Sequence, residues 1–305
     1  QDIAGLTTAQ IAGLTSVQVA SLTTDQVLAL TSEDVQALSL VQIKSLRTDQ
    51  VAALETADIA AISSKLISGL SSSQFAALTT AQIGSLTTAQ LSALGVQIPS
   101  LSQSQVRGLT TAQLSSLSLA SFKKLTAEAL SGLSTTQFQV LDTADLLALS
   151  SAQLQGLTTA QLQVLSTQAI RALQSSQVAS LTTEQLASLN TSQVVAFSSL
   201  QIKALSEMQI AALTTAQIEK IPTSQLNVLS SVQVAALRSD QVEALTTEQV
   251  TLLTSSQIKA LGTAQIQAMQ TQDLAVMSQT QLASLSAVQM AALSTQQIGR
   301  ASCRE

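Results

Sequence analysis

Large aliphatic residues recur along the chain with a period of eight. With Leu6 as position 1, steps of eight reach Leu94; after one missing residue the register resumes at Leu101 and runs to Leu293, which gives 37 units. The position-1 residues that are not leucine are Ile62, Phe197, Ile221, Met269 and Met277. Position 6 is Ile, Val, Leu, Phe or Met in every unit. The pattern therefore predicts two buried positions in each unit.

A period of eight fits neither one continuous helix nor a regular strand. At about 100° per residue, eight residues leave a drift of about 80° per unit, so the two apolar positions would point in every direction around a long helix. In a strand, positions 1 and 6 would fall on opposite faces. A short helix that begins anew in each unit places position 6 and the next position 1 on one face. We therefore expect one helix of about six or seven residues in every unit.

Hydroxyl residues mark where each helix should begin. Position 2 is Ser or Thr in most units, and position 5 is Gln in 29 units. With the N-cap at position 2, this glutamine is N3 and completes a capping box. Where position 2 is another residue, position 3 carries the hydroxyl, and we expect it to supply the cap. These pairs are Arg47-Thr48, Glu55-Thr56, Asp142-Thr143, Gln174-Ser175, Pro222-Thr223, Arg238-Ser239 and Gly262-Thr263. Asp at position 5, as in Asp34, Asp58, Asp145 and Asp273, keeps an acceptor.

One unit alone buries too little apolar surface to offset the entropy of ordering eight residues, so the units must stack. The small residues at position 8, glycine in several units, would let neighbouring backbones approach closely. We expect positions 1 and 6 to be the most buried and position 7 the most exposed. The predicted fold class is all-α: a repeat solenoid, or superhelix, of one short capped helix per eight-residue unit. The pattern sets neither the number of units per turn nor the handedness.

The domain prediction is a single octapeptide-repeat solenoid over residues 1–297. Its irregular unit, residues 94–100, holds Gly95, the deletion and Pro99; we expect either a kink or a locally absorbed bulge there. Residues 298–305, Ile-Gly-Arg-Ala-Ser-Cys-Arg-Glu, resemble the translation of a common sequencing adapter. They are predicted to be a non-native tail on a metagenomic fragment. Residues 299–305 should be frayed or outside the repeat, and Cys303 should have no functional partner.

The composition excludes many familiar kinds of site. The chain has no His and one Cys, which removes the commonest general base and cysteine-based metal sites. A net charge of -5 with 13 basic residues argues against a nucleic-acid partner, and no apolar run approaches the length of a membrane span. Ser64 beside Lys65, Glu33 beside Asp34, and Asp142 near Asp145 are expected from the repeat itself, as is the sequon at Asn190, Thr191 and Ser192. We predict no catalytic, cofactor-binding or metal-binding residues, no cofactor, and no enzymatic activity.

The unit at residues 78–85, Leu-Thr-Thr-Ala-Gln-Ile-Gly-Ser, shows the motif most clearly. It resembles the Leu-Thr-Thr-x-Gln-Ile/Val octapeptide arrays of very large bacterial secreted or surface proteins. The resemblance extends from Asp2 to Gln297. It implies an extracellular or cell-surface location and a structural or adhesive spacer, whose partners would be other domains of the same larger chain or a surface ligand.

Two classes of function stay open. The first is a structural spacer or scaffold without catalysis, which near-identical units favour. The second is a ligand-binding array for ice, polysaccharide or protein on a repeated Thr face. The second requires threonine hydroxyls that are free of helix capping and stand outward in a regular row.

Overall fold

The computed structural model describes residues 3–301, apart from the side chains of Ala4 and of residues 299–301. The described residues form 36 α-helices and two 3-10 helices and contain no strand. The α-helices have four to seven residues, most of them five or six, and short extended segments join them. The chain is thus an all-α repeat solenoid. It divides into two compact parts, residues 1–157 and residues 158–305. The single solenoid over 1–297 stays a prediction.

The first part, residues 1–157, contains η1 and α1 to α18, with η2 between α11 and α12. The bounds are η1 Ile3–Gly5, α1 Thr8–Ala12, α2 Ser16–Ser21, α3 Thr24–Leu28, α4 Ser32–Ala37, α5 Leu40–Ser45, α6 Thr48–Ala53, α7 Thr56–Ala61, α8 Ser64–Ile67, α9 Ser72–Ala76, α10 Thr80–Ser85, α11 Thr88–Ala93, η2 Ile98–Ser100, α12 Gln103–Gly108, α13 Thr111–Ser116, α14 Leu119–Phe122, α15 Ala127–Ser131, α16 Thr135–Gln139, α17 Thr143–Ala148 and α18 Ser151–Gln155.

The second part, residues 158–305, contains α19 to α36. The bounds are α19 Thr159–Gln163, α20 Thr167–Ala172, α21 Ser175–Ser180, α22 Thr183–Ser188, α23 Thr191–Val195, α24 Ser199–Lys203, α25 Glu207–Ala212, α26 Thr215–Lys220, α27 Thr223–Leu226, α28 Ser231–Ala235, α29 Ser239–Glu243, α30 Thr247–Thr251, α31 Ser255–Ala260, α32 Thr263–Ala268, α33 Thr271–Val276, α34 Gln279–Ala283, α35 Ala287–Ala291 and α36 Thr295–Ala301.

Helices α1 to α35 begin directly after the N-cap residue at position 2 and end at position 6, 7 or 8 of their unit. In α10 the N-cap Thr79 is extended (φ -71°, ψ 162°), and its hydroxyl accepts from the Gln82 N–H at 3.2 Å. Leu86 ends the helix by returning to extended backbone (φ -58°, ψ 135°), and its N–H donates to Ile83 O at 3.3 Å. Because positions 1 and 2 are both outside the helix, most helices are slightly shorter than the six or seven residues expected.

The expectation that position 3 supplies a missing cap is wrong. At Arg47, as at six other N-caps, position 2 is still the N-cap, position 3 is the first helical residue, and the side chains of positions 2 and 3 accept no hydrogen bond from the helix start. The N-caps of this kind are Arg47, Glu55, Gln174, Pro222, Arg238, Gly262 and Gln270. Position 2 of α17 is different, because the Asp142 carboxylate itself accepts from the Asp145 N–H at 2.8 Å.

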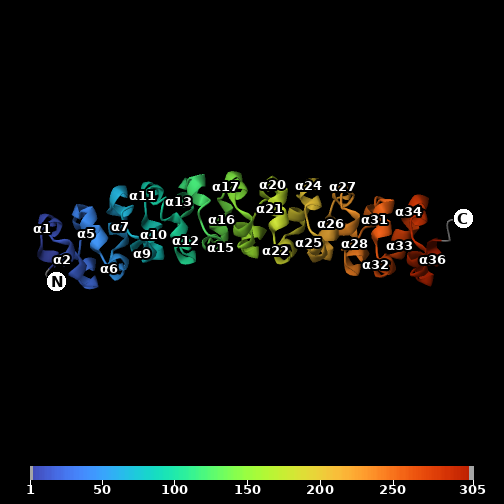
Figure 1. Ribbon diagram of the computed structural model, residues 1–305, viewed down its shortest axis with the longest axis horizontal. Coiled ribbons are helices and arrows are strands. Elements are labelled where there is room, and N and C mark those ends of the chain that lie inside the picture. The colour runs from blue at the N-terminus through green and yellow to red at the C-terminus, as the bar shows by residue number, and fades with distance from the viewer. Residues whose placement is uncertain (1–2, 302–305) are drawn as a thin grey trace. The chain divides into compact units, whose positions relative to one another are not determined.

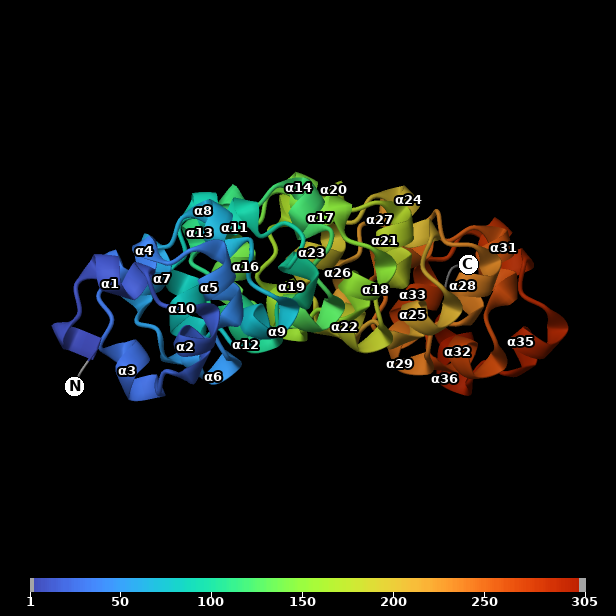
Figure 2. The same ribbon diagram turned by 60° about the vertical axis from the view of Figure 1, so that its left-hand side comes forward.

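Each helix packs beside the helix three units further along the chain. Within the first part of the chain, α1 contacts α4, α4 contacts α7 and α7 contacts α10 (Figures 1 and 2). Small residues at position 8 make this approach close, as predicted: a Cβ added at Gly156 would lie 2.7 Å from Cβ of Ala127 in the helix three units earlier. At Gly108 an added Cβ would collide with Thr80 O.

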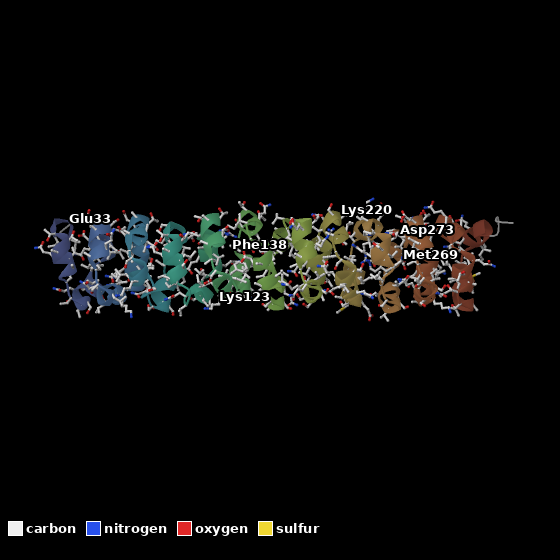
Figure 3. The ribbon with its side chains drawn as sticks, turned by 90° about the horizontal axis from the view of Figure 1, so that it is seen from above. Glu33, Lys123, Phe138, Lys220, Met269 and Asp273 are labelled. Carbon is white, nitrogen blue, oxygen red and sulfur yellow. The ribbon has the colours of Figure 1, made fainter. Side chains whose placement is uncertain are left out.

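Positions 1 and 6 form the core, as predicted. Ile83 and Ile218 at position 6 are completely buried, and Leu213 at position 1 is as well. In Figure 3, Phe138 and Met269 lie within the ribbon; they are 1% and 3% exposed. Near the C-terminus Met290, at position 6, is 45% exposed.

The prediction that position 7 is the most exposed is wrong. The most exposed large apolar residues at regular positions lie at position 4, where Val17 is 76% and Met208 75% exposed. Leu28, at position 7, is 48% exposed. Position 7 lies in the last turn of the helix, which contacts position 8 of the helix three units later: a Cβ added at Gly84 would lie 2.8 Å from Gly108 O. Position 4 lies in the first turn and faces outward.

The irregular unit is absorbed locally. Leu94 to Gln97 form turns after α11, and the 3-10 helix η2 replaces the α-helix of this unit. Its core residue Ile98 is completely buried. Gln97 Nε2 donates to Ser68 O at 3.2 Å and to Leu70 O at 3.4 Å. The unit therefore keeps its contacts with the preceding turn of the solenoid.

The last helix, α36, runs through Ala301, one residue beyond the usual end at position 8. The backbone of residues 299–301 thus belongs to the helix; that residues 299–305 are frayed or outside the repeat stays a prediction. Residues 302–305, and with them the prediction for Cys303, lie outside the described residues.

Candidate functional site

The glutamine at position 5 carries the most extensive polar contacts of the fold. Gln241 Oε1 accepts from the backbone N–H of Arg238 at 2.7 Å, which is the capping-box bond. Its Nε2 donates to Leu213 O at 2.7 Å and to Ile210 O at 3.0 Å, 28 and 31 residues earlier. The side chain is completely buried. One amide thus satisfies three backbone groups in two turns of the solenoid.

We call the glutamines that make such bonds to an earlier turn the glutamine ladder. In the first part of the chain they include Gln42, Gln50, Gln74, Gln82, Gln90, Gln97, Gln105, Gln113, Gln137 and Gln153. In the second part they include Gln193, Gln201, Gln209, Gln217, Gln225, Gln233, Gln241, Gln249, Gln257, Gln265, Gln281, Gln289 and Gln297.

The ladder closes the open ends of the helices. The acceptors are the carbonyls of position 6 or 7, in the last turn of the helix four units earlier, and of the leucine that follows it. Such carbonyls lack the partner four residues on that carbonyls inside a helix have; the position-6 carbonyl accepts in addition from the N–H three residues on, as Ile210 O does from Leu213 at 3.2 Å. Because each helix packs along the one three units earlier while its glutamine reaches the end of the one before that, a turn of the solenoid takes between three and four units.

The sequence reasoning missed this second role of the glutamine. A signal was present: position 5 holds Gln in 29 units and never Glu. Glutamate completes a capping box equally well, but it has no N–H to donate. The selection of the amide over the carboxylate therefore indicates a donor requirement, which the capping box alone does not create.

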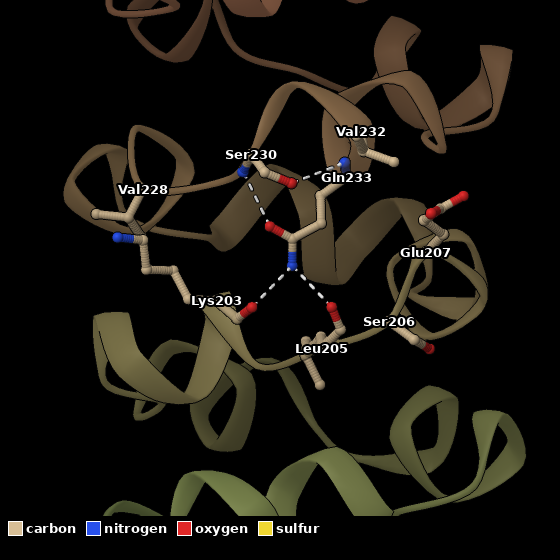
Figure 4. A pocket seen from close by; sticks show the side chains of 8 residues that line it. All are labelled: Lys203, Leu205, Ser206, Glu207, Val228, Ser230, Val232 and Gln233. Carbon is tan, nitrogen blue, oxygen red and sulfur yellow. Dashed lines mark hydrogen bonds between the residues drawn. The ribbon is translucent and has the colours of Figure 1, made fainter.

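Open grooves recur between successive turns. One, of about 540 Å³, is lined by position 7 of one unit, positions 1 to 3 of the next, and residues three units further along (Figure 4). Its lining is Lys203, Leu205, Ser206, Glu207, Val228, Ser230, Val232 and Gln233. The equivalent groove of about 330 Å³ runs along Glu219, Ile221, Pro222, Thr223, Thr246, Glu248 and Gln249. Equivalent positions hold Lys203 in one and Glu219 in the other, so the charge is not repeated.

The polar group in the first groove is already engaged. Gln233 Oε1 accepts from the Ser230 N–H at 2.9 Å, and Nε2 donates to Leu205 O at 2.8 Å and Lys203 O at 3.3 Å (Figure 4). A ligand would have to break ladder bonds to use this amide.

A second kind of groove lies along the first turns of the helices. The larger example, of about 400 Å³, is lined by Thr167, Arg171, Thr191, Ser192, Val195, Ala196 and Lys220. The equivalent groove in the first part of the chain, of about 170 Å³, is lined by Thr80, Gln103, Ser104 and Arg107. Lys220 forms an exposed ion pair with Glu219 at 2.8 Å, which offsets part of the positive charge.

The carboxylates considered in the sequence lie at helix starts. Glu33 is exposed, while Asp34 accepts from the Thr31 N–H at 3.0 Å and hydroxyl at 2.7 Å. Burial would raise the pKa of Asp34, but the hydrogen bonds from Thr31 and from the Thr8 hydroxyl outweigh it and lower the pKa. Asp142 and Asp145 cap each other's backbone N–H groups, at 2.8 and 3.2 Å. Burial, with the charge of Asp142 adding to it, raises the pKa of Asp145.

The remaining candidates lie at or directly after helix N-caps. Asn190 Oδ1 accepts from the Gln193 N–H at 2.9 Å, so the sequon asparagine is an N-cap. Ser64 is the first residue of α8, and Lys65, beside it, is exposed. The threonines at position 2 likewise cap their own helices: Thr214 Oγ1 accepts from the Gln217 N–H at 3.2 Å. In residues 3–301, no three His, Cys, Asp or Glu side chains are grouped to hold a metal ion.

No helix in the described part of the chain combines the length and the apolar character that crossing a membrane requires. No curated protein matches the sequence. The ALTTAQ repeat family model matches it eight times, over residues 1–32, 27–64, 51–88, 138–168, 159–191, 188–221, 218–255 and 266–300. Residues 77–82 have the sequence Ala-Leu-Thr-Thr-Ala-Gln itself. Since these matches cover well over half of the chain, the protein belongs to the ALTTAQ repeat family.

Proposed function

We propose that this chain is a structural spacer or scaffold, without catalysis, in a large bacterial extracellular or surface protein. The glutamine ladder is the observation that carries the proposal. It spends a buried amide in unit after unit on joining one turn of the solenoid to an earlier turn, as Gln50 does with Leu22 O at 2.7 Å and Val19 O at 3.0 Å. In a chain built this way each turn is held by the turn before it, so the exposed residues can vary from unit to unit without weakening the stacking.

The absence of catalysis is part of the same proposal. Nucleophilic hydrolysis needs a base beside a serine or threonine, and the chain has no His. The hydroxyls at position 2 accept hydrogen bonds from helix N–H groups, and most ladder amides are buried and engaged. The acids of the sequence lie at helix starts, where the helix dipole favours negative charge.

Small-angle X-ray scattering on deletion variants tests the spacer function. Removing residues 205–228, three whole units, joins turns in register, because each helix packs along the one three units earlier. We expect a folded chain whose maximum dimension falls in proportion to the units removed. Removing residues 205–216, one and a half units, breaks the register and should unfold the neighbouring helices. A maximum dimension that does not change with the 24-residue deletion would contradict the spacer proposal.

A ligand-binding array is the second candidate. It is favoured by the recurring grooves with exposed hydroxyl residues at their edges, such as Thr167 and Ser192 beside Arg171. Ice, a polysaccharide or a protein would be bound along several units at once. Ice-recrystallisation and glycan-binding measurements separate the two proposals, because a pure spacer gives neither inhibition of ice growth nor saturable glycan binding, and an array gives binding that scales with the number of units.

A further inference from the structure

Asp273 interrupts the glutamine ladder in the second part of the chain. It occupies position 5 of its unit, is completely buried, and neither carboxylate oxygen has a hydrogen-bond partner. The expectation that an aspartate at position 5 keeps the capping acceptor is therefore wrong here. Its N-cap neighbour Gln270 instead sends Nε2 to Glu243 O at 2.9 Å, one of the carbonyls that a ladder glutamine would reach. An unpartnered buried carboxylate calls for a physical explanation.

Two other aspartates at position 5 have the partners that Asp273 lacks. Asp58 accepts from the Glu55 N–H at 3.1 Å and from the Ser32 hydroxyl, 26 residues earlier, at 2.8 Å. Asp34 accepts from the Thr31 N–H at 3.0 Å and from the Thr31 hydroxyl at 2.7 Å, and Thr8, also 26 residues earlier, helps to lower its pKa. At Asp34 the donors lower the pKa and so favour the ionised carboxyl group. Thr247 holds the equivalent place for Asp273, but its hydroxyl does not bond the carboxylate.

The surroundings of Asp273 offer no compensating charge in the described part of the chain. Helix α33 packs against α30 and α36. Glu248 on α30 and Glu243 at the end of α29 are exposed acids, and Asp240 on α29 is paired with Arg238 at 2.9 Å. The side chain of Arg300 on α36 lies outside the described residues. Each described charge near this helix is therefore turned to solvent or already paired.

We propose that Asp273 makes this part of the array a pH-sensitive joint. Protonated, its carboxyl group is neutral and carries an O–H donor, so it no longer places a charge in the buried space that a ladder glutamine fills in other units. Ionised, it is an unpaired negative charge beside backbone carbonyls, and α33 is held less firmly. The joint is closed in acid and loosens at neutral and higher pH.

The direction of the effect follows from the titration of the carboxyl group. Burial raises the pKa of Asp273 from 3.8 to about 6, and the backbone N–H of Gln270, which lies near the carboxylate without the geometry of a hydrogen bond, offsets this only in part. The folded form thus holds the proton more tightly than the open form. No penalty exists below about pH 4; it grows as the pH rises, and it is complete above about pH 6. The ratio of closed to open α33 should fall by about fifty-fold between pH 4 and pH 8.

Hydrogen exchange of the full chain, followed by mass spectrometry and corrected for the intrinsic rate at each pH, tests the joint. We expect the protection of α33 to fall by about fifty-fold between pH 4 and pH 8, and α7, which contains Asp58, to show no comparable loss. D273Q restores the residue of the repeat, so α33 should then be as protected at pH 8 as at pH 4. NMR titration of the Asp273 carboxyl carbon should give a midpoint near 6.

Three results would overturn the proposal. One is equal protection of wild-type α33 at pH 4 and pH 8, and another is a D273Q variant that keeps the pH dependence. The third is protection at pH 8 that is restored by exchanging sodium for potassium or calcium, because a bound cation and not a proton would then neutralise the carboxylate. D273N, which removes the charge and keeps the size, should behave like D273Q in its loss of pH dependence.

Discussion

Gln225 Oε1 is buried without a hydrogen-bond partner because Pro222, three residues earlier, has no N–H to give it. In Gln233, one unit later, the same atom accepts from the Ser230 N–H at 2.9 Å. The other half of Gln225 is intact, since its Nε2 donates to Val195 O at 2.9 Å and to Phe197 O. The ladder and the capping box are therefore separable, and one substitution removes a single arm.

P222T should stabilise the protein, because it adds the missing N–H for Gln225 Oε1 and a hydroxyl cap for the Gln225 N–H. A buried acceptor without a partner costs about 1–3 kcal/mol, a cap is worth about 1 kcal/mol, and losing the proline costs about 0.4–1 kcal/mol through the unfolded chain. We expect a net gain of about 1–2 kcal/mol in hydrogen exchange of α27. P222A, which restores only the N–H, should gain less; equal values for the two variants would contradict a separate cap contribution.

Q241E tests the donor role of the ladder. The carboxylate can still accept from the Arg238 N–H, but it loses the bonds to Leu213 O and Ile210 O and places negative charge against them. We expect a loss of several kcal/mol at pH 7. Burial should raise the folded pKa of this glutamate above its ordinary value, so the part of the penalty that comes from the charge should disappear below about pH 4 and grow as the pH rises. Urea unfolding at pH 4 and pH 7 measures both.

Q18E is the matched control. Gln18 is exposed and its Oε1 accepts from the Thr15 N–H at 2.8 Å, whereas its Nε2 makes no hydrogen bond among the described residues. Glutamate fulfils this capping role equally well, so Q18E should change stability by less than about 0.5 kcal/mol. Similar losses from Q18E and Q241E would show that the glutamines act only through the capping box.

The periodicity predicted the fold because both of its signals are local. Leucine at position 1 and an aliphatic residue at position 6 mark the buried face, and a hydroxyl at position 2 with glutamine at position 5 marks the helix start. Both are physical requirements inside one unit. Helix length was slightly overestimated because the extended residues, such as Leu86 and Thr87, take two places in each period.

What the sequence reasoning could not supply depends on the stacking of turns. Which carbonyls Gln82 reaches follows from the number of units per turn, and a strictly repeated octapeptide has no longer period that reveals it. The same stacking shields part of position 7 and leaves position 4 outward, which is why position 7 is not the most exposed as predicted. It also isolates Asp273, while a hydroxyl 26 residues earlier supports Asp58.

G108A tests the close approach of stacked helices. A methyl group on Gly108 would collide with Thr80 O and crowd its Cγ2 at 2.8 Å. Separating the helices should cost about 1–3 kcal/mol in thermal or urea unfolding. In G13A the new Cβ would be 3.5 Å from the carbonyls of Ala9 and Gln10 in its own helix, an ordinary contact. G13A should be neutral or more stable by up to about 1 kcal/mol; a loss as large as that of G108A would contradict the packing explanation.

I218D and K203A together test which positions carry the fold. Ile218 lies at position 6 and is completely buried, so I218D puts an unpaired charge into the core and should cost several kcal/mol. Lys203 lies at position 7 with an exposed side chain, and what it gives the ladder is its backbone carbonyl, which accepts from Gln233 Nε2 at 3.3 Å. K203A keeps that carbonyl and should change the free energy of unfolding by less than about 0.5 kcal/mol. Circular dichroism during urea unfolding compares the two, and a K203A chain as destabilised as I218D would mean that the side chains of position 7, and not only their backbone, hold the turns together.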